Sequence, residues 1–127
     1  MEQYLIDTNV VSDYFSASFD LSGMNFMDGV MNSVPNISVI TQIELLCWKT
    51  SDATSQNVSS FVKDSVIFNI DTDIVEQRIE IRKNKKIKTP DAIIAATALT
   101  NNYTLVTNNE KDFAGIPRLK LVNPHKI

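Results

Sequence analysis

The 127-residue chain has few of the residues that build histidine- and cysteine-based sites. It contains one cysteine, Cys47, and one histidine, His125. That excludes an internal disulfide, a multi-cysteine metal site and a zinc site made of several histidines. His125 lies third from the end of the chain, where chains tend to fray, so a histidine-centred catalytic triad is not expected. Any enzyme chemistry must therefore come from carboxylates, hydroxyls, amides and amines.

Glycine and long apolar runs are also scarce. Only three glycines occur, and none forms a glycine-rich loop of the kind that cradles nucleotide phosphates. No apolar run approaches the roughly 20 residues that span a bilayer. No basic-then-apolar leader opens the chain either. These absences predict a soluble protein of the cytoplasm without a membrane partner.

The charge of the chain is small overall but uneven. The net charge of −3 argues against a wholly basic protein that coats nucleic acid. Half of the twelve basic residues nevertheless fall within eleven positions: Arg78, Arg82, Lys83, Lys85, Lys86 and Lys88. This segment is either a solvated helix face running into a lysine-rich loop or a phosphate-binding surface for RNA or DNA. In the second interpretation the candidate RNA-binding residues are Arg78, Arg82, Lys85 and Lys86.

Short apolar runs alternate with helix-length segments along the whole chain. The runs predict strands at residues 3–6, 37–40, 66–70, 104–107 and 119–122. A short helix is expected at 10–15 and, after a loop at 16–23, a second helix over the segment that holds Met24, Phe26, Met27, Val30 and Met31. Further helices are expected at 41–48, 51–63, 72–84 and 89–101, the last with Thr89 as its N-cap. Strands separated by helices imply parallel crossovers. The sequence thus predicts one α/β domain over residues 1–127, a three-layer α/β/α sandwich with a central, mostly parallel five-stranded sheet.

Three acids stand where an open α/β sheet would bind a ligand. Asp7 ends the first apolar run, Glu44 follows the second, and Asp91 lies near the start of an alanine-rich helix. Each also has an ordinary structural explanation. Asp7 could cap the next helix, and Glu44 could close a capping box that begins at Thr41. Asp91, at the second helical position, would be favoured there by the helix dipole alone.

A fourth group of polar residues follows the strand at 104–107. Thr107, Asn109 and Asp112 could complete a polar pocket, whereas Glu110 could close a second capping box from Thr107. Strand-end groups in a parallel sheet open on the same edge, so these residues are expected to meet the three acids. Carboxylates crowded together repel one another unless a cation neutralises them. Oxygen ligands alone favour Mg²⁺ or Mn²⁺, which suits phosphoryl chemistry.

Four segments in this order resemble the PIN-domain ribonucleases, and among them the VapC toxins of prokaryotic toxin–antitoxin pairs. The resemblance spans nearly the whole chain, and its most specific part is the segment that contains Asp91. The segments are Ile6-Asp7-Thr8-Asn9, Ile40-Thr41-x-x-Glu44-Leu45, Thr89-Pro90-Asp91-Ala92-Ile93-Ile94-Ala95-Ala96 and Leu105-Val106-Thr107-Asn108-Asn109-Glu110-Lys111-Asp112-Phe113.

The resemblance implies an endoribonuclease that depends on Mg²⁺ or Mn²⁺ and cleaves tRNA or another structured RNA. It also implies a homodimer and an antitoxin partner. Carried over by position, the catalytic and metal-binding acids are Asp7, Glu44 and Asp91. The fourth acid of the family falls on Asn109, and Asp112 is the residue that could replace it.

Smaller roles follow from the same alignment. Thr107 would orient this corner of the site, and Asn9 would support Asp7. Trp48 stands where many relatives carry a small residue, and the sequence offers no role for it.

Three other functions compete with this interpretation. A phosphoacceptor receiver domain would need an acidic pair after the first strand and a late Lys-Pro, and both are missing. A haloacid-dehalogenase-type phosphatase would need Asp-x-Asp, but Asn9 takes the third position. The remaining alternative is a PIN-like RNA- or partner-binding module whose metal site is weakened by Asn109.

Overall fold

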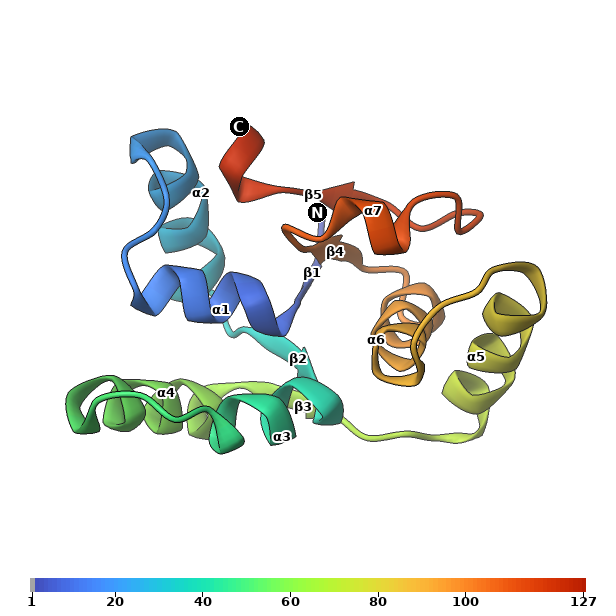
Figure 1. The fold of residues 1–127 in the computed structure, drawn as a ribbon, viewed down its shortest axis with the longest axis horizontal. Coiled ribbons are helices and arrows are strands. Elements are labelled where there is room, and N and C mark those ends of the chain that lie inside the picture. The colour runs from blue at the N-terminus through green and yellow to red at the C-terminus, as the bar shows by residue number, and fades with distance from the viewer. Residues whose placement is uncertain (1) are drawn as a thin grey trace.

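Strands and helices alternate along the chain in the computed structural model, which describes residues 2–127 (Figure 1). The strands are β1 (Tyr4–Ile6), β2 (Asn36–Ser38), β3 (Val66–Phe68), β4 (Thr104–Val106) and β5 (Leu121–Val122). The helices are α1 (Thr8–Phe15), α2 (Leu21–Asn32), α3 (Val39–Cys47), α4 (Asp52–Asp64), α5 (Thr72–Asn84), α6 (Thr89–Thr100), α7 (Glu110–Phe113) and the 3₁₀ helix η1 (Pro124–Lys126).

All strand pairs are parallel, as the crossover argument predicts. The strands hydrogen-bond as two groups, β1-β4-β5 and β2-β3. Between the groups, the Asn36 side-chain amide of β2 donates a 3.1 Å hydrogen bond to the Tyr4 carbonyl of β1. The predicted α/β/α fold with five mostly parallel strands is therefore confirmed. Its five strands pair as three and two rather than as one continuous ladder.

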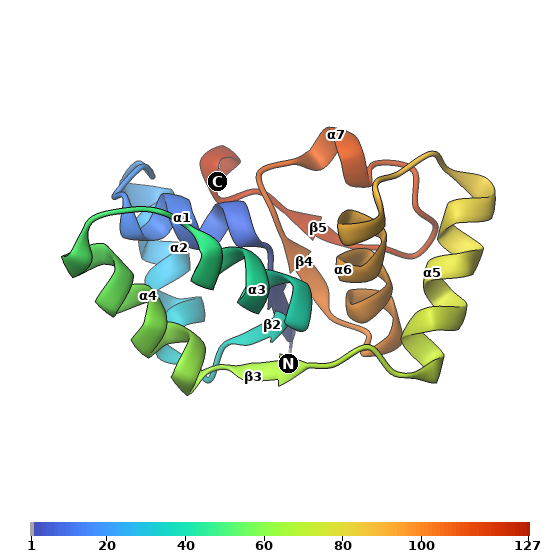
Figure 2. The ribbon, with the colours of Figure 1, turned by 60° about the horizontal axis from the view of Figure 1, so that its bottom comes forward.

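Two apolar cores lie on opposite faces of the strands. Leu5 and Leu105 belong to the core under α5 and α6, whereas their neighbours Ile6 and Val106 belong to the core under α1 to α4. Successive side chains of a strand point to opposite faces, which explains this division. Figure 2 shows α5 and α6 on one side of β1, β4 and β5, and α1, α2 and α4 on the other.

Side-chain caps decide several boundaries that apolar patterns miss. The predicted strand at 37–40 ends at Ser38, because the Ser38 hydroxyl accepts a hydrogen bond from the Ile40 N–H and starts α3 there. The helix after the first loop begins at Leu21, because Asp20 accepts from the Gly23 N–H. Thr89 is the first residue of α6 and Lys88 its N-cap position, so the assignment of Thr89 as N-cap was wrong.

The C-terminal end of the chain is held in place. The His125 ring packs on Phe19, with 4.4 Å between ring centroids, and its Nε2 lies 2.8 Å from the Asp13 carboxylate. Gly23 of α2 makes room for this packing, since a Cβ there would come within 2.3 Å of the Pro124 carbonyl oxygen. The expectation of a frayed end at His125 is wrong. Within residues 2–127, no helix combines the length and the apolar character needed to cross a membrane.

Candidate active site

Asp7 lies at the junction of β1 and α1 and both caps a helix and faces the site. It is 4% exposed, and its Oδ1 accepts a 2.8 Å hydrogen bond from the Thr8 N–H. The capping role considered for Asp7 is thus real. It occupies only one carboxylate oxygen, and an ionised carboxylate can accept about four hydrogen bonds.

The second oxygen of Asp7 is held by a residue one hundred positions away. The Thr107 hydroxyl at the end of β4 donates a 2.7 Å hydrogen bond to Asp7 Oδ2. This contact exists because β1 and β4 are paired in register, so that both strands end at the same edge. Thr107 therefore lies where the sequence predicts it and fixes the orientation of Asp7.

Burial makes Asp7 an unusual acid. Loss of hydration raises its pKa to about 6 from an ordinary value of 3.8. The hydrogen bonds from Thr107 and Thr8 oppose that rise, and the negative charges of Asp91 and Glu44 add to it. Asp7, Glu44 and Asp91 thus lie near enough to repel one another, as predicted for strand-end acids of a parallel sheet.

Glu44 lies in the interior of α3 and does not form a capping box. Thr41 is the third residue of that helix, and Ser38 is its cap. Instead, Glu44 Oε1 accepts a 2.5 Å hydrogen bond from the Thr8 hydroxyl. Thr8 Oγ1 also lies 3.1 Å from Thr41 Oγ1. The structural alternative considered for Glu44 is therefore wrong, and the side chain is turned toward the Asp7 segment.

Asp91 occupies the first turn of α6, at the third helical position rather than the second. Its pKa is raised by burial first and then by the charges of Asp112 and Glu44, while Lys88 lowers it. Asp91 is therefore near both Glu44 and Asp112. The small residues of α6 allow this approach, because Ala92, Ala95 and Ala96 are fully buried in the core beside it.

Asn109 and Asp112 form a separate corner at α7. The Asn109 side-chain amide donates a 2.8 Å hydrogen bond to Asp112 Oδ2, and the Asn109 N–H donates to Thr107 Oγ1 at 3.0 Å. Glu110 does not form a capping box with Thr107. It accepts hydrogen bonds from Asn123 at 3.3 Å and from Lys126 at 2.6 Å.

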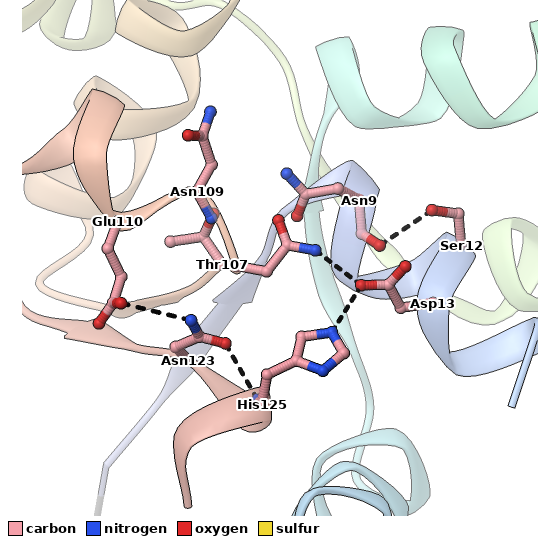
Figure 3. Close-up of polar contacts among 9 residues, drawn as sticks. Asn9, Ser12, Asp13, Thr107, Asn109, Glu110, Asn123 and His125 are labelled. Carbon is pink, nitrogen blue, oxygen red and sulfur yellow. Dashed lines mark hydrogen bonds and ion pairs between the residues drawn. The ribbon is translucent and has the colours of Figure 1, made fainter. Parts of the chain in front are cut away.

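A polar network behind the site connects the C-terminal end to the loop that carries Asn109. Asp13 Oδ2 accepts a 2.6 Å hydrogen bond from the Asn108 side-chain amide and also contacts His125. Figure 3 shows Asp13 beside His125 and Asn123 beside Glu110. None of these contacts has a signal in the sequence, because the fold brings together residues that are far apart along the chain.

Asp7, Glu44 and Asp91 line an open cleft of about 420 Å³, and its lining includes no lysine or arginine side chain. The lining residues are Asp7, Thr8, Asn9, Ser12, Glu44, Leu45, Trp48 and Asp91. Asn9 Oδ1 is buried and has no hydrogen-bond partner. Buried polar atoms normally have partners, so this oxygen is free for a water or a cation. The sequence predicts that Asn9 supports Asp7. In the structure Asn9 lines the cleft, and its side-chain oxygen accepts no hydrogen bond.

The donor set suits a hard divalent cation. It consists of carboxylate, amide and hydroxyl oxygens, which favour Mg²⁺ or Mn²⁺ over zinc or copper. Mutual repulsion among the acids also calls for a cation. Within residues 2–127, however, no three acidic, cysteine or histidine side chains are already grouped tightly enough to hold one ion. Glu44 is turned toward Thr8, so metal binding requires side chains to rotate inward.

A basic groove of about 620 Å³ begins beside the acids. It includes three of the four candidate RNA-binding residues, Arg82, Lys85 and Lys86. Lys88 and Lys111 stand near its acidic end, where Asp112 contributes to the wall. Arg78 is not part of the groove lining, and its guanidinium donates to Thr89 Oγ1 at 2.9 Å. Sequence reasoning did not single out Lys111 or Thr8, since neither role is visible without the fold.

Comparison with known proteins agrees with this arrangement. The PIN domain family matches residues 4–119. Among solved structures, the chain is similar to a toxin–antitoxin complex from Klebsiella pneumoniae, with 34% identity over 98% of this chain and 100% of the other, and a TM-score of 0.79. No curated protein matches the sequence.

Two further structures share the fold. One is VapBC2 from Rickettsia felis bound to a DNA fragment from its promoter, at 26% identity over 94% of this chain and 97% of the other, with a TM-score of 0.76. The other is FitAcB from Neisseria gonorrhoeae, at 21% identity over 98% and 100% of the two chains, with a TM-score of 0.81. At 21% identity the similarity speaks for the fold alone.

Proposed function

This chain belongs to the PIN-domain family, whose members are generally nucleases, and we propose that it is the toxin of a toxin–antitoxin pair. Its activity would be cleavage of RNA phosphodiester bonds with Mg²⁺ or Mn²⁺, in the cytoplasm. The observation that carries the proposal is the meeting of Asp7, Glu44 and Asp91 around one cleft. These acids come from three elements far apart in the sequence.

Each residue has a task in this mechanism. Asp7, Glu44 and Asp91 would hold the cation, with Asp112 closing the other side. Thr107 keeps Asp7 oriented through its 2.7 Å hydrogen bond, whereas Glu44 would leave its 2.5 Å bond to Thr8 and turn toward the cation. When a cation is bound, the chemistry it supplies is activation of a water and stabilisation of charge on the phosphate oxygens. Asn109 replaces an acid in the α7 corner, which favours one tightly held ion over two.

The basic groove would guide the RNA to these acids. A phosphate backbone is attracted by clustered Lys and Arg, and that attraction weakens as salt rises. Neutralising Arg82, Lys85 and Lys86 to Gln should therefore lower RNA affinity and flatten its salt dependence. Lys63, which is exposed on α4 away from the groove, supplies the control Lys63→Gln. Equal affinities in the two proteins would remove the groove from the proposal.

The activity is tested by incubating the purified chain with structured RNA and Mg²⁺ or Mn²⁺, and separately with EDTA. Asp91→Asn should reduce the rate by about a hundredfold or more, since it removes a carboxylate from the metal site without changing shape. Glu76→Gln, at an exposed acid of α5, should leave the rate unchanged. Cleavage that survives EDTA, or that survives Asp91→Asn in folded protein, would contradict the metal-site mechanism.

The alternative function is a binding module in which the weakened corner at Asn109 has ended catalysis. It predicts RNA binding without any cleavage in either metal.

Partners are also part of the proposal. The Klebsiella pneumoniae structure is a toxin–antitoxin complex, which supports an antitoxin partner for this chain, probed by co-expression with the neighbouring reading frame. A homodimer is expected from the family resemblance and is measured by light scattering.

A further inference from the structure

Trp48 stands in the acid cleft without a role in the chemistry described above. It follows the last residue of α3 as its C-terminal cap and lies one helical turn beyond Glu44. Its ring packs in part against the core under α1 to α4, and the residue also lines the cleft shared by Asp7 and Asp91. It is half-buried. One part of a rigid aromatic ring is therefore held by the core while another part is open to the site.

The charges around Trp48 determine what could bind beside it. The cleft walls contain three carboxylates and no lysine or arginine. The carboxylates would be occupied by the cation that acts on the reacting phosphate, and the cleft lining has no lysine or arginine left to hold a neighbouring phosphate by charge. An unpaired base is neutral and has a flat face, and base–aromatic stacking needs neither a cation nor a particular sequence.

The other hollow beside the acids is lined by cations. The positive charge of Lys88 favours the ionised form of Asp91, and Lys88 lines the basic groove together with Lys111 and Asp112. Trp48 and the two lysines line different hollows, and Asp91 belongs to the cleft of Trp48 while it interacts with Lys88. An RNA strand running from one hollow to the other would meet an aromatic ring in the acid cleft and cations in the basic groove.

We propose that Trp48 is a stacking platform for an unpaired base next to the cleavage point, so that the substrate is RNA in a single-stranded segment. The inference rests on the proposed ribonuclease function and adds the residue that would position a base beside the reacting phosphate. A paired base inside a duplex cannot offer its face to a protein side chain. Stacking on Trp48 therefore requires an unpaired base.

Trp48 is the only tryptophan of the chain, so its fluorescence reports directly on this contact. The protein is titrated with a short unpaired oligoribonucleotide and with the same sequence in a blunt duplex. Ca²⁺ replaces Mg²⁺, so that the carboxylates are neutralised while cleavage is slowed. The unpaired strand should quench the emission in a saturable way, and the duplex should not. Equal quenching by both, or no quenching by a bound unpaired strand, would overturn the inference.

Substitutions separate stacking from packing. The affinity for the unpaired strand is measured by anisotropy of a labelled RNA. Trp48→Phe should keep it within about threefold, whereas Trp48→Leu, which preserves apolar packing but has no aromatic face, should lose about tenfold. Leu46→Ala is the control, at an exposed apolar residue of the same helix that does not line the cleft. Equal affinities for Trp48→Leu and Trp48→Phe in folded proteins would also overturn the inference.

A cleavage assay on the same unpaired strand distinguishes this failure from failure of the proposed function. If the wild-type chain cleaves the strand with Mg²⁺ while Trp48 shows no quenching, the stacking platform is wrong and the nuclease stands. If the emission is quenched but no RNA is cleaved in either Mg²⁺ or Mn²⁺, the platform stands and the nuclease is wrong.

Discussion

The two halves of the acid site are built on different principles. The Asp7 half consists of Asp7, Thr8 and Thr107 at the ends of β1 and β4; Asp7 is buried, and both of its oxygens accept hydrogen bonds. The α7 corner consists of Asn109 and Asp112 in and beside a four-residue helix. There Asp112 is half-buried and held by one amide. The fold fixes the first half, whereas the second depends on the Asn109 amide that bonds Asp112 and on the Asn109 N–H that donates to Thr107 Oγ1.

The comparison shows in which half the burial of negative charge is least favourable. Burying a carboxylate disfavours its charged form, and neighbouring acids increase the effect. Asp7 bears both effects. Asp112 lies nearer to solvent and to Lys111 and Lys88 of the groove. Asp7 is thus the rigid acid of the site and Asp112 the adjustable one.

The largest expected effect concerns the stability of the metal-free protein. The pKa of Asp7 in the folded state, about 6, exceeds its ordinary value of 3.8, so between these values the native state binds the proton more tightly than the unfolded state. The stabilisation is fully present below about pH 4 and is lost as the pH rises through about 6. The loss should be on the order of 3 kcal/mol. Urea unfolding in EDTA at a series of pH values measures it.

Asp7→Asn should flatten this pH dependence, because the titrating group is gone. Asp73→Asn, at an exposed acid of α5, should retain the wild-type curve. If wild type and Asp7→Asn lose stability equally between pH 4 and 7, burial of Asp7 is not the source of the pH dependence.

The next effect tests how the rigid half is held. Thr107→Val keeps the shape of the side chain but leaves Asp7 Oδ2 without its 2.7 Å hydrogen bond. Metal affinity should fall by about ten- to a hundredfold, as is usual when a partner that orients a ligand is lost. Isothermal titration with Mn²⁺ measures the change. Thr104→Val, at the first residue of β4 and bonded to Glu2, is the matched control. An unaltered Mn²⁺ affinity in Thr107→Val would show that Asp7 is oriented by the backbone alone.

The α7 corner should be adjustable in either direction. Asn109→Asp would replace the amide that bonds Asp112 with a second carboxylate, and the repulsion between them makes a bound cation more favourable. We expect the Mg²⁺ concentration for half-maximal cleavage to fall by about tenfold or less. Asn57→Asp adds the same charge at an exposed position of α4 and should change nothing. A higher Mg²⁺ requirement in Asn109→Asp would mean that the amide, rather than an acid, is needed here.

Comparison of the halves also shows which features of the fold and the site could be predicted from the sequence. It predicted all five strands and brought Asp7, Glu44 and Asp91 to one edge, because strand-end polarity and parallel crossovers are local signals. It left a capping box at Glu44 open as an alternative and placed an N-cap at Thr89 instead of Lys88, since the choice among neighbouring hydroxyls depends on where a helix starts. The sequence could not predict the hydrogen bond between Thr8 and Glu44. It joins residues 36 positions apart through packing of α1 against α3.

The smallest expected effect concerns the C-terminal contacts, which the sequence also missed. His125 touches Phe19 and Asp13, and Asp13 in turn holds Asn108, two residues before Glu110. His125→Ala should lower the free energy of unfolding by about 1 kcal/mol, since exposed polar pairs and one aromatic contact contribute little each. Cleavage should change by less than about twofold, because Thr107 and Asp7 are paired independently of this end. A tenfold loss of cleavage at unchanged stability would instead make the chain end part of the α7 corner, and the rigid and adjustable halves would no longer be separable.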